Sequence, residues 1–210
     1  VAEVAQIEAV AMDMWSPYFE TASKWIPLAA DKIVFDRYHV VQHMNHAVDQ
    51  VRRAESKALW QEGDATLRGT RHLWLYAEEN LPEHRAEQFA SLRGLRLKTG
   101  RAWAIKEMLR DLWNCPSRPA AEAFHARWHA WATRARMPAV FKVAKMVKSH
   151  LHNILTYYAH RITNAVSEGL NSAIQTIKKR AGGYRNVENF KTAIYFHCGG
   201  LDLYPARSTR

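Results

Sequence analysis

Two acidic residues lie where α/β proteins commonly bind hard metal ions. Asp13 directly follows the apolar residues 4–12, and Glu168 lies in the first turn of the last long helical segment. Ligands bind at the carboxyl ends of strands in such sheets, and carboxylate oxygens from separate elements suit Mg²⁺. Two such ions can activate a water and stabilise the leaving oxygen of a phosphodiester. On spacing alone, the ordinary roles of helix cap and helix-dipole partner are favoured for both acids.

A second polar group begins with residues 36–39, which read Asp-Arg-Tyr-His. Three histidines of this region share one helical face: His39, His43 and His46. Such a group with an aspartate could suit zinc, but no glutamate lies beside a His-x-x-x-His pair, so the metalloprotease motif is absent. His125 and His129 repeat the spacing without an acidic partner. Contacts to polar neighbours or phosphates are therefore favoured over a zinc site.

Basic and aromatic side chains form the third candidate group. A basic cluster lies at and beyond the end of the Glu168 helix: Lys178, Lys179, Arg180 and Arg185. Such a cluster could hold DNA backbone beside a catalytic carboxylate, or could be a solvated helix end favoured by the dipole. The chain has eight tryptophans, and most are expected in the core. Trp74 is the best candidate to stack on an extruded base, although core packing is its favoured use.

Composition limits the class of protein. The chain has 210 residues, 48% of them hydrophobic, which is enough for one domain with a core or one domain with an insertion. The net charge of +10 favours a polyanionic partner such as nucleic acid, although a basic protein without one is an equal alternative. Two distant cysteines predict neither a zinc site nor a disulfide framework. No apolar run is long enough to span a membrane and no signal peptide opens the chain, so a cytoplasmic location is expected.

The predicted secondary structure begins with a strand-helix-strand segment and then becomes helical. Residues 4–12 are predicted as a buried strand or a short helix, with Asp13 favouring the strand. Ser16 as N-cap and Pro17 open a helix over residues 16–24, and residues 31–35 form a second strand. A crossover helix makes the two strands parallel. Two strands are too few for a stable sheet, so further strands are expected upstream.

The rest of the chain is predicted to be helical. A helix from Val40 closes at Arg52 and Arg53, and prolines open later helices, giving about five between residues 40 and 158. Pro82, Pro119 and Pro138 are these openers. A last long helix, residues 168–180, is capped by Ser167 and ended by Gly182 and Gly183.

Several motifs resemble, in family order, the ISL-three-type insertion-sequence transposases of the acidic-triad (DDE) group. Each motif is weak alone, but their ordered sum is specific and covers nearly the whole chain. They are residues 13–15 with Tyr18, 36–40, 48–55 (VDQVRRAE), 71–75 (RHLWL), 97–101 (LKTGR), 163–171 (TNAVSEGLN), 179–190 (KRAGGYRNVENF) and 197–201.

The resemblance implies an α/β fold class: a partial ribonuclease H-like fold with a large all-α insertion, mostly helical overall. Residues 1–39 would form the strand-helix-strand core of this fold. Residues 40–160 would be the helical insertion, and residues 161–210 the last catalytic helix with the C-terminal tail. These boundaries come from the family pattern and not from composition.

The resemblance also implies roles for single residues. Asp13 would be the second acid of the triad, and Glu168 the third, in a Glu-Gly-x-Asn motif that ends at Asn171. These acids would hold two Mg²⁺ or Mn²⁺ ions. Asp36 and His39 would match an acidic-x-x-His element that supports the site and positions DNA, more than it binds metal.

The activity implied is metal-dependent cleavage at a transposon end, followed by attack of the freed 3′-OH on target DNA. The partners would be transposon ends and target DNA, and strand transfer with paired ends favours a homodimer. The first triad aspartate of the family precedes Asp13, where this chain has only Glu3 and Glu8 as acids. The chain is therefore expected to be a fragment with little or no cleavage of its own.

Two other classes of function stay open. The first is a truncated or repurposed non-catalytic DNA-binding protein, which would bind DNA independently of Mg²⁺ and of Asp13. The second is a helical protein-interaction module, with the tryptophan-rich insertion as a dimer surface and no salt-sensitive DNA affinity.

Overall fold

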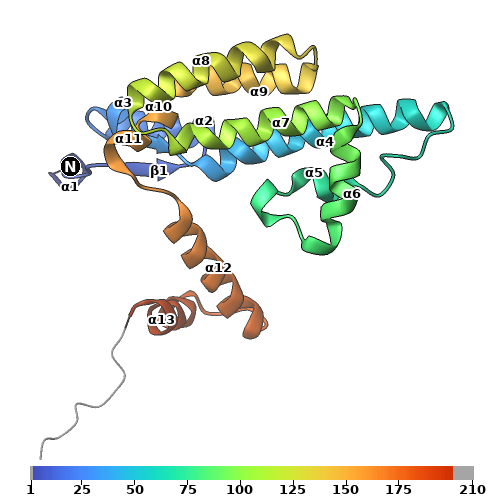
Figure 1. The fold of residues 1–210 in the computed structure, drawn as a ribbon. Coiled ribbons are helices and arrows are strands. Elements are labelled where there is room, and N and C mark those ends of the chain that lie inside the picture. The colour runs from blue at the N-terminus through green and yellow to red at the C-terminus, as the bar shows by residue number, and fades with distance from the viewer. Residues whose placement is uncertain (1, 201–210) are drawn as a thin grey trace, which may run out of the picture. The chain divides into compact units, whose positions relative to one another are not determined.

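Helices dominate the computed structural model, which describes residues 2–200 (Figure 1). The chain divides into two compact units, Val1–Ile162 and Thr163–Arg210. The first unit holds the sheet and most of the helices, and the second holds the last two helices. Among the described residues, no helix combines the length and the apolar character needed to cross a bilayer.

The sheet consists of two short parallel strands, as the strand-helix-strand pattern predicts. Strand β1 (Val10–Met12) pairs with β2 (Ile33–Phe35), and Met12 lies opposite Phe35 in the register. The connection contains helices α2 (Ser16–Trp25) and α3 (Ala29–Lys32). Strand β2 is fully buried, whereas β1 is only partly buried.

The boundaries of these elements differ from the prediction. The first apolar segment splits into helix α1 (Ala2–Ala5) and the short β1, so most of it is not strand. Helix α2 begins at Ser16 itself, and its N-cap position is Trp15, which makes no side-chain cap. Pro17 lies in the first turn as predicted, where its missing N–H costs nothing.

Helix α4 (Arg37–Gln61) is the longest element and the axis of the first unit. The prediction that it closes at Arg52 and Arg53 is wrong, because no helix breaker follows until Gly63, at a φ of 82°. One face carries the buried side chains of Val40, Met44, Ala47, Val48 and Val51. This face packs along α7 (Lys98–Arg110) and α9 (Pro138–Ser149), which run beside α4 in Figure 1.

Helices of very different length complete the first unit. Pro119 and Pro138 lie in first turns and Pro82 at an N-cap, as predicted, but the segment holds more and shorter helices than the expected five. The remaining elements are α5 (Arg71–Leu75), η1 (Glu78–Asn80), α6 (Glu83–Gly94), η2 (Asp111–Asn114), α8 (Arg118–Arg134), α10 (Leu151–Leu155) and α11 (Tyr157–His160).

Half of the tryptophans lie in the core of this unit. Trp74, Trp103, Trp113 and Trp128 are buried. The other four are more exposed than predicted: Trp15, Trp25, Trp60 and Trp131. Three of these buried indoles donate their N–H groups: Trp74 to Thr70 Oγ1, Trp103 to the Tyr76 carbonyl, and Trp128 to the Ile105 carbonyl at 2.9 Å.

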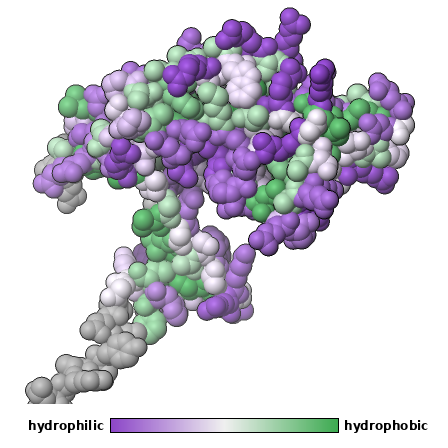
Figure 2. Space-filling model, in the orientation of Figure 1, coloured by the Kyte–Doolittle hydropathy of each residue, from purple (hydrophilic) through white to green (hydrophobic). Residues whose placement is uncertain are grey.

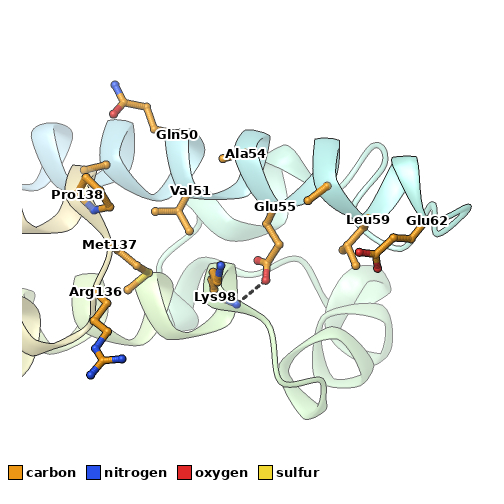
Figure 3. A pocket seen from close by; sticks show the side chains of 12 residues that line it. Gln50, Val51, Ala54, Glu55, Leu59, Glu62, Lys98, Arg136, Met137 and Pro138 are labelled. Atoms are coloured by element: carbon orange, nitrogen blue, oxygen red, sulfur yellow. Dashed lines mark hydrogen bonds between the residues drawn. The ribbon is translucent and has the colours of Figure 1, made fainter.

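Polar side chains join elements that lie far apart in sequence. Glu55 of α4 accepts hydrogen bonds from the backbone N–H groups of Lys98 and Thr99, both at 2.7 Å, and so caps the start of α7. This contact borders a groove of about 550 Å³ along α4 (Figure 3). Lys106 of α7 is almost fully buried and donates to the Tyr76 carbonyl at 2.6 Å, just beyond the end of α5.

The second unit consists of helices α12 (Ala165–Arg180) and α13 (Val187–Cys198), which pack on each other. Helix α12 begins three residues before Glu168, so Ser167 lies within it and is not its N-cap. Gly182 and Gly183 follow with positive φ angles, as a helix end requires. Helix α13 was not predicted.

No side chain that the structure describes in this second unit is buried. Apolar side chains are visible on the surface of this unit in Figure 2. Val166, Leu170, Val187 and Phe196 are among the exposed large hydrophobic residues of the chain.

Candidate functional site

The carboxyl ends of the two parallel strands bring two aspartates to one edge of the sheet. Asp13 follows β1 and Asp36 follows β2, and Met12 and Phe35 before them are paired in the register. The backbone N–H of Asp36 donates to the Met12 carbonyl at 3.0 Å, which extends the ladder by one bond. The sequence pattern thus placed both acids on the edge where α/β sheets bind ligands.

The two aspartates have different surroundings. Asp36 is buried and is the N-cap of α4, where its Oδ1 accepts from the backbone N–H of Tyr38 at 2.7 Å. This cap satisfies one of the orphan donors at the start of α4. The side chain of Asp13 is 42% exposed. Asp36 therefore fixes the start of α4, and Asp13 is the acid that solvent and a ligand can reach.

Asp13 faces a histidine from the first turn of α4. His39 Nδ1 lies 3.7 Å from Asp13 Oδ1, and the same oxygen accepts the Met14 N–H at 2.6 Å. Both contacts involve Oδ1. The His39 side chain is mostly buried, and its ring stacks edge-on against Tyr38.

Two further histidines, His43 and His46, follow His39 along α4. Partial desolvation lowers the pKa of His43, and the neighbouring imidazoles of His46, His39 and His150 lower it further. The Asp13 carboxylate acts in the opposite direction and raises that pKa. His43 therefore favours its neutral form at neutral pH, in which one ring nitrogen can accept a hydrogen bond.

Metal-ligating side chains do not gather into a complete set in the part of the chain that the structure describes. No group of three or more His, Cys, Asp or Glu side chains there is arranged to hold a metal ion. Asp13 can supply one hard oxygen ligand, so a divalent ion at this edge would need further oxygen ligands from elsewhere.

Glu168 belongs to the second unit. It is partly buried in the first turn of α12, and its backbone N–H donates to the Asn164 carbonyl at 3.0 Å. Asn171 follows one turn later and is exposed. Residues three apart share a helix face, so Glu168 and Asn171 lie one above the other. The structure describes Asp13 and Glu168 each within its own unit.

The predicted basic cluster lies at the opposite end of α12 from Glu168. Lys178, Lys179 and Arg180 form its last turn, where positive charge is favoured by the helix dipole. Arg185 lies in the connection to α13, and all four side chains are exposed. Glu168 and this cluster are thus separated by most of the helix length.

Trp74 does not serve as a base-stacking platform in this structure. Its side chain is completely buried, and its indole Nε1 donates to Thr70 Oγ1 at 3.1 Å. The ring contacts Phe89 edge-on, with centroids 5.1 Å apart. Its burial confirms core packing, the favoured use, and contradicts the alternative of base stacking, because a buried ring offers no face to a base.

A buried acid in the middle of α4, Asp49, was not predicted as a site residue. Asp49 Oδ1 accepts from Arg52, with Nη2 at 2.8 Å, while Oδ2 lies 3.1 Å from Arg53 Nε and 3.5 Å from Arg71 Nε. Burial would raise the pKa of Asp49, but the Arg52 hydrogen bond and the three guanidinium charges hold it below its usual value. The available signal was an acid between Val48 and Val51, on the apolar face of a helix.

Comparison with known proteins points to one family. A family model described as a transposase, of the DDE class and ISL-three type, matches residues 2–194. A curated transposase for insertion sequence element IS1001 from Bordetella parapertussis is 31% identical over 189 residues. The match covers 88% of this chain but 46% of the relative, so the chain spans about half of the relative's length. No solved structure matches the chain.

Proposed function

The chain belongs to the ISL-three-type DDE transposases, and from this premise we propose that it forms the later part of a metal-dependent catalytic domain. In the intact enzyme, this domain would cleave a phosphodiester at a transposon end and join the freed 3′-OH to target DNA. The observation that carries the proposal is the position of Asp13, exposed at the carboxyl end of a parallel strand.

Asp13 would hold divalent metal together with Glu168. The chemistry of the residues fits Mg²⁺ or Mn²⁺, since both are carboxylates, and the Asp13 side chain is 42% exposed with Oδ1 anchored by the Met14 N–H. Bound ions would lower the pKa of the attacking water and stabilise the leaving oxygen. His39 beside Asp13 would keep that carboxylate oriented, and Asp36 would hold the start of α4 that carries His39.

The arrangement of the chain supports a ribonuclease H-like core with a helical insertion. The parallel β1 and β2, each followed by an aspartate, are the elements such a core requires from residues 1–39. Residues 40–160 would be the insertion, and residues 161–210 would bring the last acid. A first aspartate and further strands would come from a segment preceding β1 in the intact enzyme.

DNA is the proposed partner, at transposon ends and at the target. The exposed Lys178, Lys179, Arg180 and Arg185 would contact backbone phosphates, and the net charge of +10 would favour encounter with DNA. Joining paired transposon ends to one target favours a homodimer.

The test uses the full transposase reading frame in a cell-based excision assay with a marked transposon. Asp13→Ala and Glu168→Ala should each abolish excision, while Asp31→Ala, an exposed acid on α3, should preserve it. Excision that persists in the Asp13→Ala variant would contradict the metal-ligand role. A crystal of the intact domain soaked in Mn²⁺ should show anomalous density at both carboxylates.

A non-catalytic DNA-binding protein is the second candidate function. It is favoured by one observation, namely the exposed basic residues at the end of α12 in a chain of net charge +10, since such side chains can contact phosphates without a metal ion. This function predicts that DNA affinity is equal in Mg²⁺ and in EDTA, and that Asp13→Ala leaves it unchanged. The catalytic function predicts that Mg²⁺ and Asp13 both strengthen binding to a transposon end.

A further inference from the structure

A basic groove lies on α4 and on the connection from α4 to α5, within the first unit. We define it by five cations and one aromatic ring: Arg52, Arg53, Lys57, Arg68, Arg71 and Trp60. Four of the cations line, with Trp60, a cavity of about 430 Å³. Arg71 joins them through Asp49, since it shares that carboxylate with Arg52 and Arg53.

The arginines of this groove are held in place by a buried anion. Arg53 and Arg71 both direct Nε toward Asp49 Oδ2, at 3.1 and 3.5 Å. Their side chains are nevertheless 66% and 58% exposed, so the terminal guanidinium nitrogens remain available to solvent. A guanidinium fixed through Nε can still present two parallel N–H groups to a phosphate, which is the fork that phosphate recognition requires.

The far end of the groove is fixed in a different way. The Arg68 guanidinium lies over the Trp60 ring, 5.2 Å from its centroid, and Trp60 is 57% exposed. A cation over an aromatic face is held in one orientation without losing its charge. Asp64 also lines the cavity, but its Oδ1 accepts from the backbone N–H of Thr66 at 2.7 Å and serves the turn.

The charge balance exceeds what the fold needs. Five cations face two carboxylates, Asp49 and Asp64, which leaves a surplus of three positive charges in one patch. One arginine, Arg52, is sufficient to pair buried Asp49, because it donates from both Nε and Nη2. Four exposed cations therefore repel one another: Arg53, Lys57, Arg68 and Arg71. A bound polyanion would relieve this repulsion.

We propose that this basic groove is a second DNA-binding site, which grips the sugar-phosphate backbone through guanidinium groups oriented by Asp49. The choice of DNA as the polyanion rests on the proposed function. The groove lies on the helical body and is independent of the cluster at the end of α12. It would hold DNA away from the cleaved bond and would carry no base specificity, since phosphate contacts position without reading sequence.

The first experiment removes two exposed charges from the groove. The purified chain with Arg53→Gln and Lys57→Gln is titrated against a fluorescent duplex of about 30 base pairs at several salt concentrations. Losing two phosphate contacts should weaken binding at least about tenfold and reduce the slope of log affinity against log salt by about 2. The matched control, Lys142→Gln with Lys145→Gln on α9, removes the same charge from exposed positions and should change affinity less than about threefold. Equal losses in both variants would overturn the proposal.

The second experiment separates orientation from net charge. Asp49→Asn and Asp64→Asn each make the chain more positive by one unit, so a simple charge effect predicts tighter DNA binding in both. The proposal predicts weaker binding for Asp49→Asn, because Arg53 and Arg71 lose their anchor, and equal or tighter binding for Asp64→Asn. Tighter binding by the Asp49→Asn variant with an unchanged circular dichroism spectrum would overturn the proposal. If that variant unfolds, Arg71→Gln alone serves as the test, with a loss of about threefold or more expected and no loss overturning it.

A third variant, Lys178→Gln with Lys179→Gln on α12, distinguishes this inference from the proposed function. Loss of duplex binding in the groove variant but not in the α12 variant would support the groove and contradict the α12 contacts. Loss in the α12 variant alone would do the reverse. A duplex RNA that competes better than DNA of equal length would overturn the assignment of DNA as the ligand.

Discussion

The two compact units of this chain both contain many apolar residues but use them differently. In the first unit, helices α4, α7, α8 and α9 bury a continuous core that includes four tryptophans. In the second unit, helices α12 and α13 leave every described side chain at least partly accessible. Among the described residues, the unit that carries Glu168 thus shows no buried core, while the unit that carries Asp13 does.

This difference indicates what each unit can do alone. Buried apolar area is the main source of folding free energy, and two helices without buried side chains gain too little of it to offset the entropy of ordering. We therefore expect the first unit to set the stability of the chain. Changes in the second unit should alter function before they alter stability.

The largest expected effect is loss of a core tryptophan in the first unit. Trp128→Ala should lower the free energy of unfolding by about 3–5 kcal/mol, because it leaves a cavity and removes the hydrogen bond from the indole N–H to the Ile105 carbonyl. Urea denaturation followed by circular dichroism measures the change. Trp131→Ala, on the exposed side of the same helix, should cost about 1 kcal/mol or less. Similar losses for the two variants would contradict the position of the core.

Acid should weaken the first unit through His125. Burial, with the nearby His129 and Lys148, lowers the pKa of His125 from 6.5 to about 4. The neutral imidazole thus stabilises the fold above pH 6.5, and this contribution, about 3 kcal/mol, is lost as pH falls from 6.5 to 4. Stability measured at pH 7, 5.5 and 4 should show this loss, and His125→Leu should flatten it. His84→Gln, at an exposed position on α6, should leave the pH dependence unchanged.

A smaller effect is expected from the cap between α4 and α7. Glu55→Ala removes the acceptor for the Lys98 and Thr99 N–H groups and for the Thr99 hydroxyl, and should cost about 1–2 kcal/mol. Glu62→Ala, at the exposed end of α4, provides the matched control and should change stability by less than about 0.5 kcal/mol. Chemical denaturation of both variants compares them directly. A Glu55→Ala variant as stable as the control would show that water replaces the cap at no cost.

The smallest effect is expected in the second unit. Val166→Ala, at a position that is 82% exposed on α12, should change the free energy of unfolding by no more than about 0.5 kcal/mol. The same urea titration measures it. A decrease in the free energy of unfolding above about 1 kcal/mol would mean that α12 contributes to a buried core, and would contradict the difference between the units.

Local signals in the sequence were sufficient for the parallel strand pair and for the main helix starts. The two aspartates follow strands, and Pro82, Pro119 and Pro138 stand at or beside helix starts, because these features depend on residues a few positions apart. Helix α13 also had a local signal that was overlooked: Asn186 caps it by accepting from the Glu188 N–H at 2.8 Å. Val187, Phe190 and Ile194 then follow at helical spacing.

Other features could not be predicted from local patterns, because their partners are distant in sequence. Lys106 is buried since its amine meets the Tyr76 carbonyl, 30 residues away. The Asp49 group includes Arg71, which reaches it only after the chain has turned back. In the candidate site, the position of Asp13 followed from its strand, whereas the nearby His39 needed the fold.

The cap that Glu55 provides has a consequence for how the chain folds. The Glu55–Thr99 hydrogen bond joins residues 44 positions apart, so the first turn of α7 is completed only when α4 has docked on it. Secondary structure and tertiary docking must then form in one concerted step, and the intervening residues 56–97 become a loop closed by that step. Amide hydrogen exchange at Lys98 and Thr99 should therefore report the docking of the two helices. The exchange rates of these two amides should match those of the central residues of α4 and be slower than those of fraying helix ends.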